Sequence, residues 1–177
     1  MSAQPNVLLG VCGGIAAYKT AELTRRLIKQ GANVQVVMTT NAERFITPLT
    51  LQALSGNAVR TSLWDHAAEL GMGHIELARW ADLVVIAPAS ADCLARLATG
   101  QCNDLLTTLC LATTAPILVA PAMNTVMWEH PATRANMQTL AERGVSVVGP
   151  GVGELAERES GPGRMSEPSE IVEAINA

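Results

Sequence analysis

Three short polar segments of the sequence stand where a parallel sheet would place a ligand. Gly13-Gly14, Thr39-Thr40-Asn41 and Ser90-Ala91-Asp92 each follow an apolar run typical of a buried strand. Ligands of open α/β sheets bind beyond the carboxyl ends of the strands. Glycines let backbone N–H groups approach a phosphate, and hydroxyl and amide groups can bond the rest of a flat cofactor. Together the segments predict a site for a phosphorylated cofactor, whereas each alone also fits a tight turn or a helix cap.

The glycines of the first segment exclude two common nucleotide sites. Gly10, Gly13 and Gly14 do not have the GxGxxG spacing of dinucleotide-binding domains, and alanines follow them. The segment also lacks the adjacent lysine and hydroxyl residue of an ATP-binding P-loop. A mononucleotide phosphate or a plain tight turn remains compatible with these residues.

Two further residues could take part in chemistry. His74 follows Gly73 and opens an amphipathic segment, a place that suits either acid–base catalysis or a structural role. Asn124 stands among apolar neighbours where a predicted strand ends. A buried amide needs hydrogen-bond partners, so Asn124 must bond to the backbone or to a ligand.

The elements that must position these residues alternate between strand and helix. Residues 6–12, 15–30 and 33–39 read as strand, helix and strand, which is a βαβ unit of a parallel sheet. The same pattern predicts strands at 81–88, 116–120 and 145–148 and helices at 47–54, 91–99, 103–112, 131–143 and 169–175. The sequence therefore predicts one doubly wound, Rossmann-like and flavodoxin-like α/β domain over residues 1–177.

Residues 149–165 break this alternation. They contain five glycines and two prolines, so we expect a loop without a packed core of its own. A loop of this length in a regular domain is more often a functional lid than a defect.

Composition limits the partners of the chain. Its 12 basic and 16 acidic residues give a net charge of −4, which argues against nucleic acid or an anionic membrane as a partner. Only 16% of the 177 residues are charged, against about 25% in an average domain, so part of the surface is expected to be buried against other subunits. Residues 105–123 carry no charge, but their threonines and prolines favour a buried helix followed by a strand over a membrane span.

The four cysteines predict a reducing compartment. Cys12, Cys93, Cys102 and Cys110 form no CxxC pair and have no histidines at metal-ligand spacing. No signal peptide follows Met1, so we expect a cytoplasmic protein without disulfides, a metal site or a membrane segment. Each cysteine is expected to be a small buried apolar residue.

Six segments carry a resemblance that covers most of the chain. They are GGIAAYK at 13–19, HIEL at 74–77, WAD at 80–82, AP at 87–88, PAMN at 121–124 and GPGRM at 161–165. In this order the chain resembles the homo-oligomeric flavin-containing cysteine decarboxylases. The resemblance implies bound FMN, with cofactor contacts at Gly13, Gly14, Ile15, Thr39, Thr40, Asn41, Ser90, Ala91, Asp92, Cys93 and Ala122.

The resemblance also implies roles for the other candidates. His74 would be the catalytic histidine, Asn124 would help to hold the substrate carboxylate, and residues 151–165 would be a flap over the substrate. The implied substrate is a phosphorylated cysteine conjugate, 4′-phosphopantothenoylcysteine, which loses CO2 on the route to coenzyme A. The implied assembly is a homotrimer or homododecamer with flavin at the subunit boundaries.

One segment departs from the family pattern. Relatives of the pantothenate pathway usually carry Ala-Cys-Gly-Asp in the flap, and that cysteine protonates the enethiol product, whereas residues 156–160 here read AERES. Glu157 could supply the proton instead, or the reaction could end at the enethiol, as in the decarboxylases of peptides with a carboxy-terminal cysteine. A non-catalytic regulatory relative is a further alternative.

Overall fold

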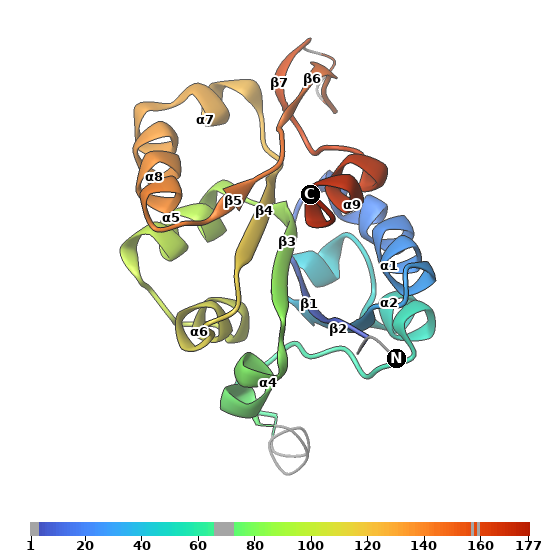
Figure 1. The fold of residues 1–177 in the computed structure, drawn as a ribbon. Coiled ribbons are helices and arrows are strands. Elements are labelled where there is room, and N and C mark those ends of the chain that lie inside the picture. The colour runs from blue at the N-terminus through green and yellow to red at the C-terminus, as the bar shows by residue number, and fades with distance from the viewer. Residues whose placement is uncertain (1–3, 66–72, 157, 159) are drawn as a thin grey trace.

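A parallel sheet of five strands forms the centre of the computed structural model, which describes residues 4–65, 73–156, 158 and 160–177 (Figure 1). The strands, in the order β2-β1-β3-β4-β5 across the sheet, are β2 (Asn33–Met38), β1 (Asn6–Val11), β3 (Leu83–Ala89), β4 (Ile117–Pro121) and β5 (Ser146–Val147). This is the flavodoxin-like order, in which the direction of winding reverses between β1 and β3. The predicted fold class is confirmed, and the reversal marks the edge where a ligand would bind.

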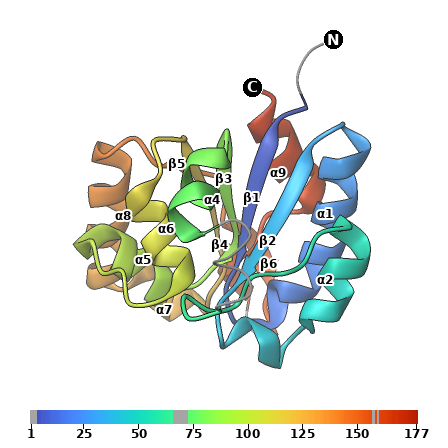
Figure 2. The ribbon, with the colours of Figure 1, turned by 90° about the horizontal axis from the view of Figure 1, so that it is seen from below.

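Helices cover both faces of this sheet, as Figure 2 shows from below. One face carries α1 (Lys19–Lys29), α2 (Pro48–Ser55) and α9 (Pro168–Ile175), and the other carries α4 (His74–Trp80), α5 (Ala91–Thr99), α6 (Leu105–Ala112) and α8 (Pro131–Glu142). Successive side chains of a strand point to opposite faces. Leu8 and Leu9 of β1 are accordingly both fully buried, but in separate apolar clusters. Burial on both faces explains why the strands are continuously apolar.

Three short helical elements lie near the carboxyl ends of the strands. They are the 3₁₀ turns η1 (Ile15–Tyr18) and η2 (Ala42–Arg44) and the helix α7 (Thr125–Glu129). The helix predicted at 15–30 therefore begins as a tighter turn, closed by a bond from the Ala17 N–H to the Gly14 carbonyl at 3.0 Å. This turn carries the chain from the Gly13-Gly14 segment into α1.

The prediction of a loop at residues 149–165 is wrong, because most of this segment is a pair of strands. Residues of this segment form the antiparallel hairpin of β6 (Gly151–Glu154) and β7 (Ser160–Arg164). Pro162 lacks an N–H group, but a strand that is paired on one side only can accept a proline. A Cβ on Gly163 would collide with the Met123 carbonyl oxygen, and the Met123 N–H donates to the Gly163 carbonyl at 2.9 Å. The hairpin is thus stabilised by contacts with a segment remote in the sequence.

The cysteines and the uncharged stretch largely follow the predictions. Cys12, Cys93 and Cys110 are buried and free, whereas Cys102 is exposed because it lies in the connection between α5 and α6. Residues 105–123 form α6 followed by β4, as predicted. In the part of the chain that the structure describes, no helix has the length and apolar character needed to cross a bilayer.

Candidate active site

A cavity of about 660 Å³ lies at the carboxyl ends of β1, β3 and β4. Its wall includes seven residues that the sequence singled out: Gly13, Gly14, Ile15, Ser90, Ala91, Ala122 and Asn124. The β6–β7 hairpin contributes further wall at residues 154–156 and 163–165. The fold therefore brings together residues from three strand ends, the first and last of which are more than 100 positions apart, in one cavity that the hairpin borders.

The two glycines of the first segment have different surroundings. A Cβ on Gly14 would meet no heavy atom within 4 Å, so the backbone at Gly14 faces open space. A Cβ on Gly13 would lie 2.6 Å from the Asn41 Cβ and 2.8 Å from the Asn41 carbonyl carbon. Gly13 thus permits the segment after β2 to pack closely, and Gly14 leaves room for a ligand.

The segment Thr39-Thr40-Asn41 borders the cavity wall without being part of it. The Thr39 N–H donates to the Val11 carbonyl at 3.0 Å, and the Thr39 hydroxyl accepts from the Ala42 N–H at 3.2 Å. These bonds fix the segment behind Gly13. The predicted cofactor contacts of Thr39, Thr40 and Asn41 stay predictions.

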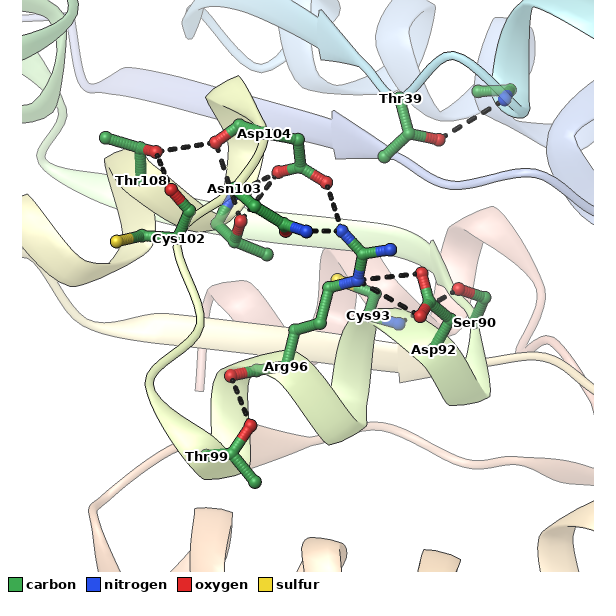
Figure 3. A network of polar contacts seen from close by, with 12 residues as sticks. Thr39, Ser90, Asp92, Cys93, Arg96, Thr99, Cys102, Asn103, Asp104 and Thr108 are labelled. Atoms are coloured by element: carbon green, nitrogen blue, oxygen red, sulfur yellow. Dashed lines mark hydrogen bonds and ion pairs between the residues drawn. The ribbon is translucent and has the colours of Figure 1, made fainter.

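Ser90, Asp92 and Cys93 belong to the first turn of α5 or its cap. The Ser90 hydroxyl accepts from the Cys93 N–H at 3.2 Å, which is an N-cap bond. The Asp92 carboxylate pairs with Arg96 at 3.0 Å, and Arg96 in turn contacts Asp104 at 3.5 Å, as Figure 3 shows. The hydrogen bond to Asp92 raises the pKa of Arg96. Asp92 is therefore paired within α5, through an arginine that also reaches the N-cap of α6, and is not part of the cavity wall.

Cys93 is buried beside a second thiol. Its hydrogen bond to the Cys12 thiol and its burial raise the pKa of Cys93 well above the usual value. A thiol in this condition is protonated at neutral pH and unreactive. Cys93 does not line the cavity, and its predicted contact with the cofactor also stays a prediction.

Asn124 is held in a defined orientation at the cavity. It is the N-cap of α7, and its side-chain oxygen accepts from the Val126 N–H at 2.8 Å. Of the two partners that the sequence allowed, backbone or ligand, the structure shows the backbone bond. A cap bond fixes the carboxamide with respect to the helix, which suits a group that orients a substrate.

His74 lies apart from these residues within one chain. It is the first residue of α4, is half-buried, and is not among the residues that line the cavity. The other predicted catalytic residue, Glu157, lies outside the residues that the structure describes. Both assignments stay predictions.

Sequence reasoning missed a charged cluster in the cavity wall. The Lys19 ammonium donates to the Glu167 carboxylate at 2.8 Å and to the Met165 carbonyl at 3.2 Å, and the Arg164 guanidinium donates to the same carboxylate at 2.6 Å. Hydrogen bonds from Lys19 and Arg164 lower the pKa of Glu167. A signal existed, because Lys19 stands four and eight residues before Leu23 and Leu27 on the buried face of α1.

Comparison with known proteins gives consistent matches. The family profile described as Flavoprotein matches residues 1–177. The coenzyme A biosynthesis bifunctional protein CoaBC of Vibrio cholerae is 63% identical over 166 residues, which are 94% of this chain and 42% of the relative. The chain thus spans less than half the length of such curated relatives.

Two solved structures match along nearly their whole length. A PPC decarboxylase with a cysteine-to-serine substitution, complexed with pantothenoylaminoethenethiol, is 36% identical with a TM-score of 0.85, and the match covers 98% of this chain and 97% of that one. The FMN binding protein AtHal3 is 37% identical with a TM-score of 0.83, and the match covers 98% and 96% of the two chains.

Proposed function

This chain belongs to the flavoprotein family, and we propose that it binds FMN and decarboxylates 4′-phosphopantothenoylcysteine towards 4′-phosphopantetheine. The observation that carries the proposal is the convergence of three strand ends on one cavity. The similarity to CoaBC and to PPC decarboxylase supports the substrate, and the similarity to AtHal3 supports the cofactor. Residues 1–177 would be one decarboxylase domain, and residues 151–165 its substrate flap.

The cavity fits FMN in its size and in the type of groups that it presents. The open space at Gly14 leaves the start of η1 accessible to a phosphate, and Ser90, Ala91 and Ala122 would contact the rest of the cofactor. When bound, FMN supplies the two-electron oxidation of the substrate thiol to a thioaldehyde, which can accept the electrons released as CO2 leaves.

The protein's own residues would bind and orient the cysteine end of the substrate. The carboxamide of Asn124, fixed by its bond to the Val126 N–H, would hold the substrate carboxylate beside the cofactor. His74 would take up the thiol proton, because the imidazole of histidine is a common proton acceptor in catalysis.

A homo-oligomer would place His74 at this cavity. Large apolar side chains are exposed around the cavity. Ile15 and Tyr18 are each 63% exposed, Val126 is 69% exposed and Met127 is 49% exposed. An apolar rim of this kind is typical of a surface that another protein covers. We infer a homotrimer or homododecamer in the cytoplasm, in which α4 of one subunit supplies His74 to the cavity of the next.

The proposed function predicts a yellow protein that releases CO2. The FMN-loaded protein, incubated anaerobically with 4′-phosphopantothenoylcysteine, should give a product lighter by the mass of CO2, or by CO2 and two hydrogens. Absorbance and mass spectrometry measure the two results. A colourless preparation that takes up no added FMN, or an unchanged substrate mass, contradicts the proposal.

The absent flap cysteine predicts which product accumulates. A thiol has an unperturbed pKa near 8.5 and a glutamate near 4.3, so at neutral pH Glu157 is a poor proton donor to an enethiolate carbon. The cysteine-to-serine variant of PPC decarboxylase was solved with pantothenoylaminoethenethiol, which is an enethiol. We expect the enethiol to accumulate in a single anaerobic turnover, with the flavin left reduced.

Glu157→Cys should restore the saturated product and reoxidise the flavin in the same assay. Ser160→Cys is the matched control, because it adds a thiol to the same hairpin and should leave the enethiol as the product. If the unmodified protein already yields only the saturated product, the assigned role of position 157 fails. The same assay with a peptide ending in cysteine tests the alternative substrate class.

A further inference from the structure

The cavity wall carries more positive than negative charge on one side. Of the described residues that line the cavity, Lys19 and Arg164 are basic and Glu154 is acidic. Both basic side chains contact the single carboxylate of Glu167, at 2.8 and 2.6 Å. Two cations thus share one carboxylate in this cluster, and the carboxylate of Glu170 also acts on Arg164 through space.

Lys19 has a structural role. Its side chain is 9% exposed, and its ammonium donates to the Met165 carbonyl as well as to Glu167. These two bonds tie the residues that follow β7 to the start of α1. Because an ammonium group has three donors, this geometry leaves Lys19 little capacity for a ligand.

Arg164 has the exposure and the donors that Lys19 lacks. Its side chain is 49% exposed. Its guanidinium has five N–H donors, and an N–H of Nη2 donates to Glu167. The side chain crosses over Gly153 of the neighbouring strand, where a Cβ would lie 3.3 Å from Nη1 and 3.7 Å from Cδ. Gly153 therefore leaves the space in which this guanidinium lies along the hairpin.

We propose that Arg164 binds the phosphate group of the substrate while Glu167 holds the guanidinium in place. The inference rests on the proposed function, since it requires a substrate that carries a phosphate dianion. A planar guanidinium binds phosphate through two parallel hydrogen bonds, and a partner carboxylate pre-orients it. The flavin phosphate would occupy the backbone site at Gly14, which leaves Arg164 for the substrate.

This assignment gives β7 two functions. The strand is docked on Met123 through Gly163, and the next residue carries the group that recognises the phosphate. A phosphorylated substrate would thus contact the hairpin at Arg164 and the helix cap at Asn124. The hairpin would select phosphorylated over unphosphorylated substrates.

Steady-state kinetics of Arg164→Gln test this proposal. With the FMN-loaded variant we expect the KM for 4′-phosphopantothenoylcysteine to rise about 10- to 100-fold, the usual effect of losing a charge-assisted bond. The kcat, and the KM for unphosphorylated pantothenoylcysteine, should change little. Arg164→Lys should fall between the variant and the unmodified protein, since it keeps the charge but not the paired donors.

Arg134→Gln is the matched control, because it removes an exposed guanidinium from α8 at a residue that does not line the cavity and lies outside the hairpin. It should leave both KM values unchanged. If Arg164→Gln raised the KM of both substrates equally, the role of Arg164 would be structural. If it weakened the binding of FMN but not of riboflavin, Arg164 would bind the flavin phosphate. Either result overturns the proposal.

A binding measurement separates this proposal from the proposed function. Calorimetry of the FMN-loaded protein with 4′-phosphopantothenate and with pantothenate needs no turnover. If the unmodified protein decarboxylates neither substrate, the proposed function fails. A preference for the phosphorylated ligand that Arg164→Gln abolishes would still support a phosphate site, and equal affinity for the two ligands would refute it.

Discussion

His74→Asn is expected to lower the rate of decarboxylation by about 10²- to 10⁴-fold, the usual contribution of a general acid–base group. Asparagine can still donate and accept hydrogen bonds, but it cannot take up a proton from the substrate thiol. Because the cofactor contacts proposed above do not include His74, FMN binding should remain. Single-turnover kinetics with FMN-loaded protein measure the loss, and flavin absorbance verifies the bound cofactor.

The control for this substitution is His130→Asn. His130 is the N-cap of α8, where its Nδ1 accepts from the Ala132 N–H at 3.1 Å, and asparagine is also a good N-cap. This variant should keep full activity and nearly full stability. Near-normal turnover in His74→Asn would leave His74 with a structural role only.

A mixture of two inactive variants is expected to regain activity. Asn124→Asp should be inactive alone, because its carboxylate would face the carboxylate of the substrate. If each cavity is completed by His74 of a neighbouring subunit, a hybrid of Asn124→Asp and His74→Asn contains sites in which both residues are intact. In a cyclic trimer each site joins two chains, so random equal mixing restores about a quarter of the activity.

The mixing experiment needs proof that subunits exchange. The two variants should be unfolded and refolded together with FMN, and native mass spectrometry should show mixed oligomers before the assay. If hybrids form but stay inactive, His74 acts at the cavity of its own chain or at no cavity. Each variant refolded alone is the control for recovery caused by refolding itself.

The fold was predictable because its signals are local. Apolar strands that end in glycine or polar turns, such as Asn6–Val11, fix both the sheet and the edge at which Ser90 and Ala91 meet Gly14. The hairpin at β6 and β7 was not predictable, because its glycines and proline indicate a loop until they pack against Met123. Local patterns cannot show contacts between segments that are distant in the sequence.

The individual site residues show the same difference between local patterns and remote contacts. The first turn of α5 was correctly placed at the cavity, but Asp92 pairs with Arg96 of the same helix and does not line the cavity. The ion pair of the buried Lys19 depends on the partly exposed Glu167, 148 positions further along the chain. A side chain whose orientation is set by such a remote partner can be placed on an element from sequence, but its contacts cannot.

The close approach of Gly163 to Met123 divides the hairpin into a fixed base and an exchangeable tip. Any side chain at 163 would push β7 away from the segment that carries Asn124, and one at 161 would meet Thr125, so protein engineering must preserve both glycines. Among the described residues of the tip, Leu155, Ala156 and Arg158 carry no such restriction from this contact. Transplanting that short stretch from a relative with another substrate preference should therefore alter substrate choice while the scaffold, the cofactor site and the assembly are retained.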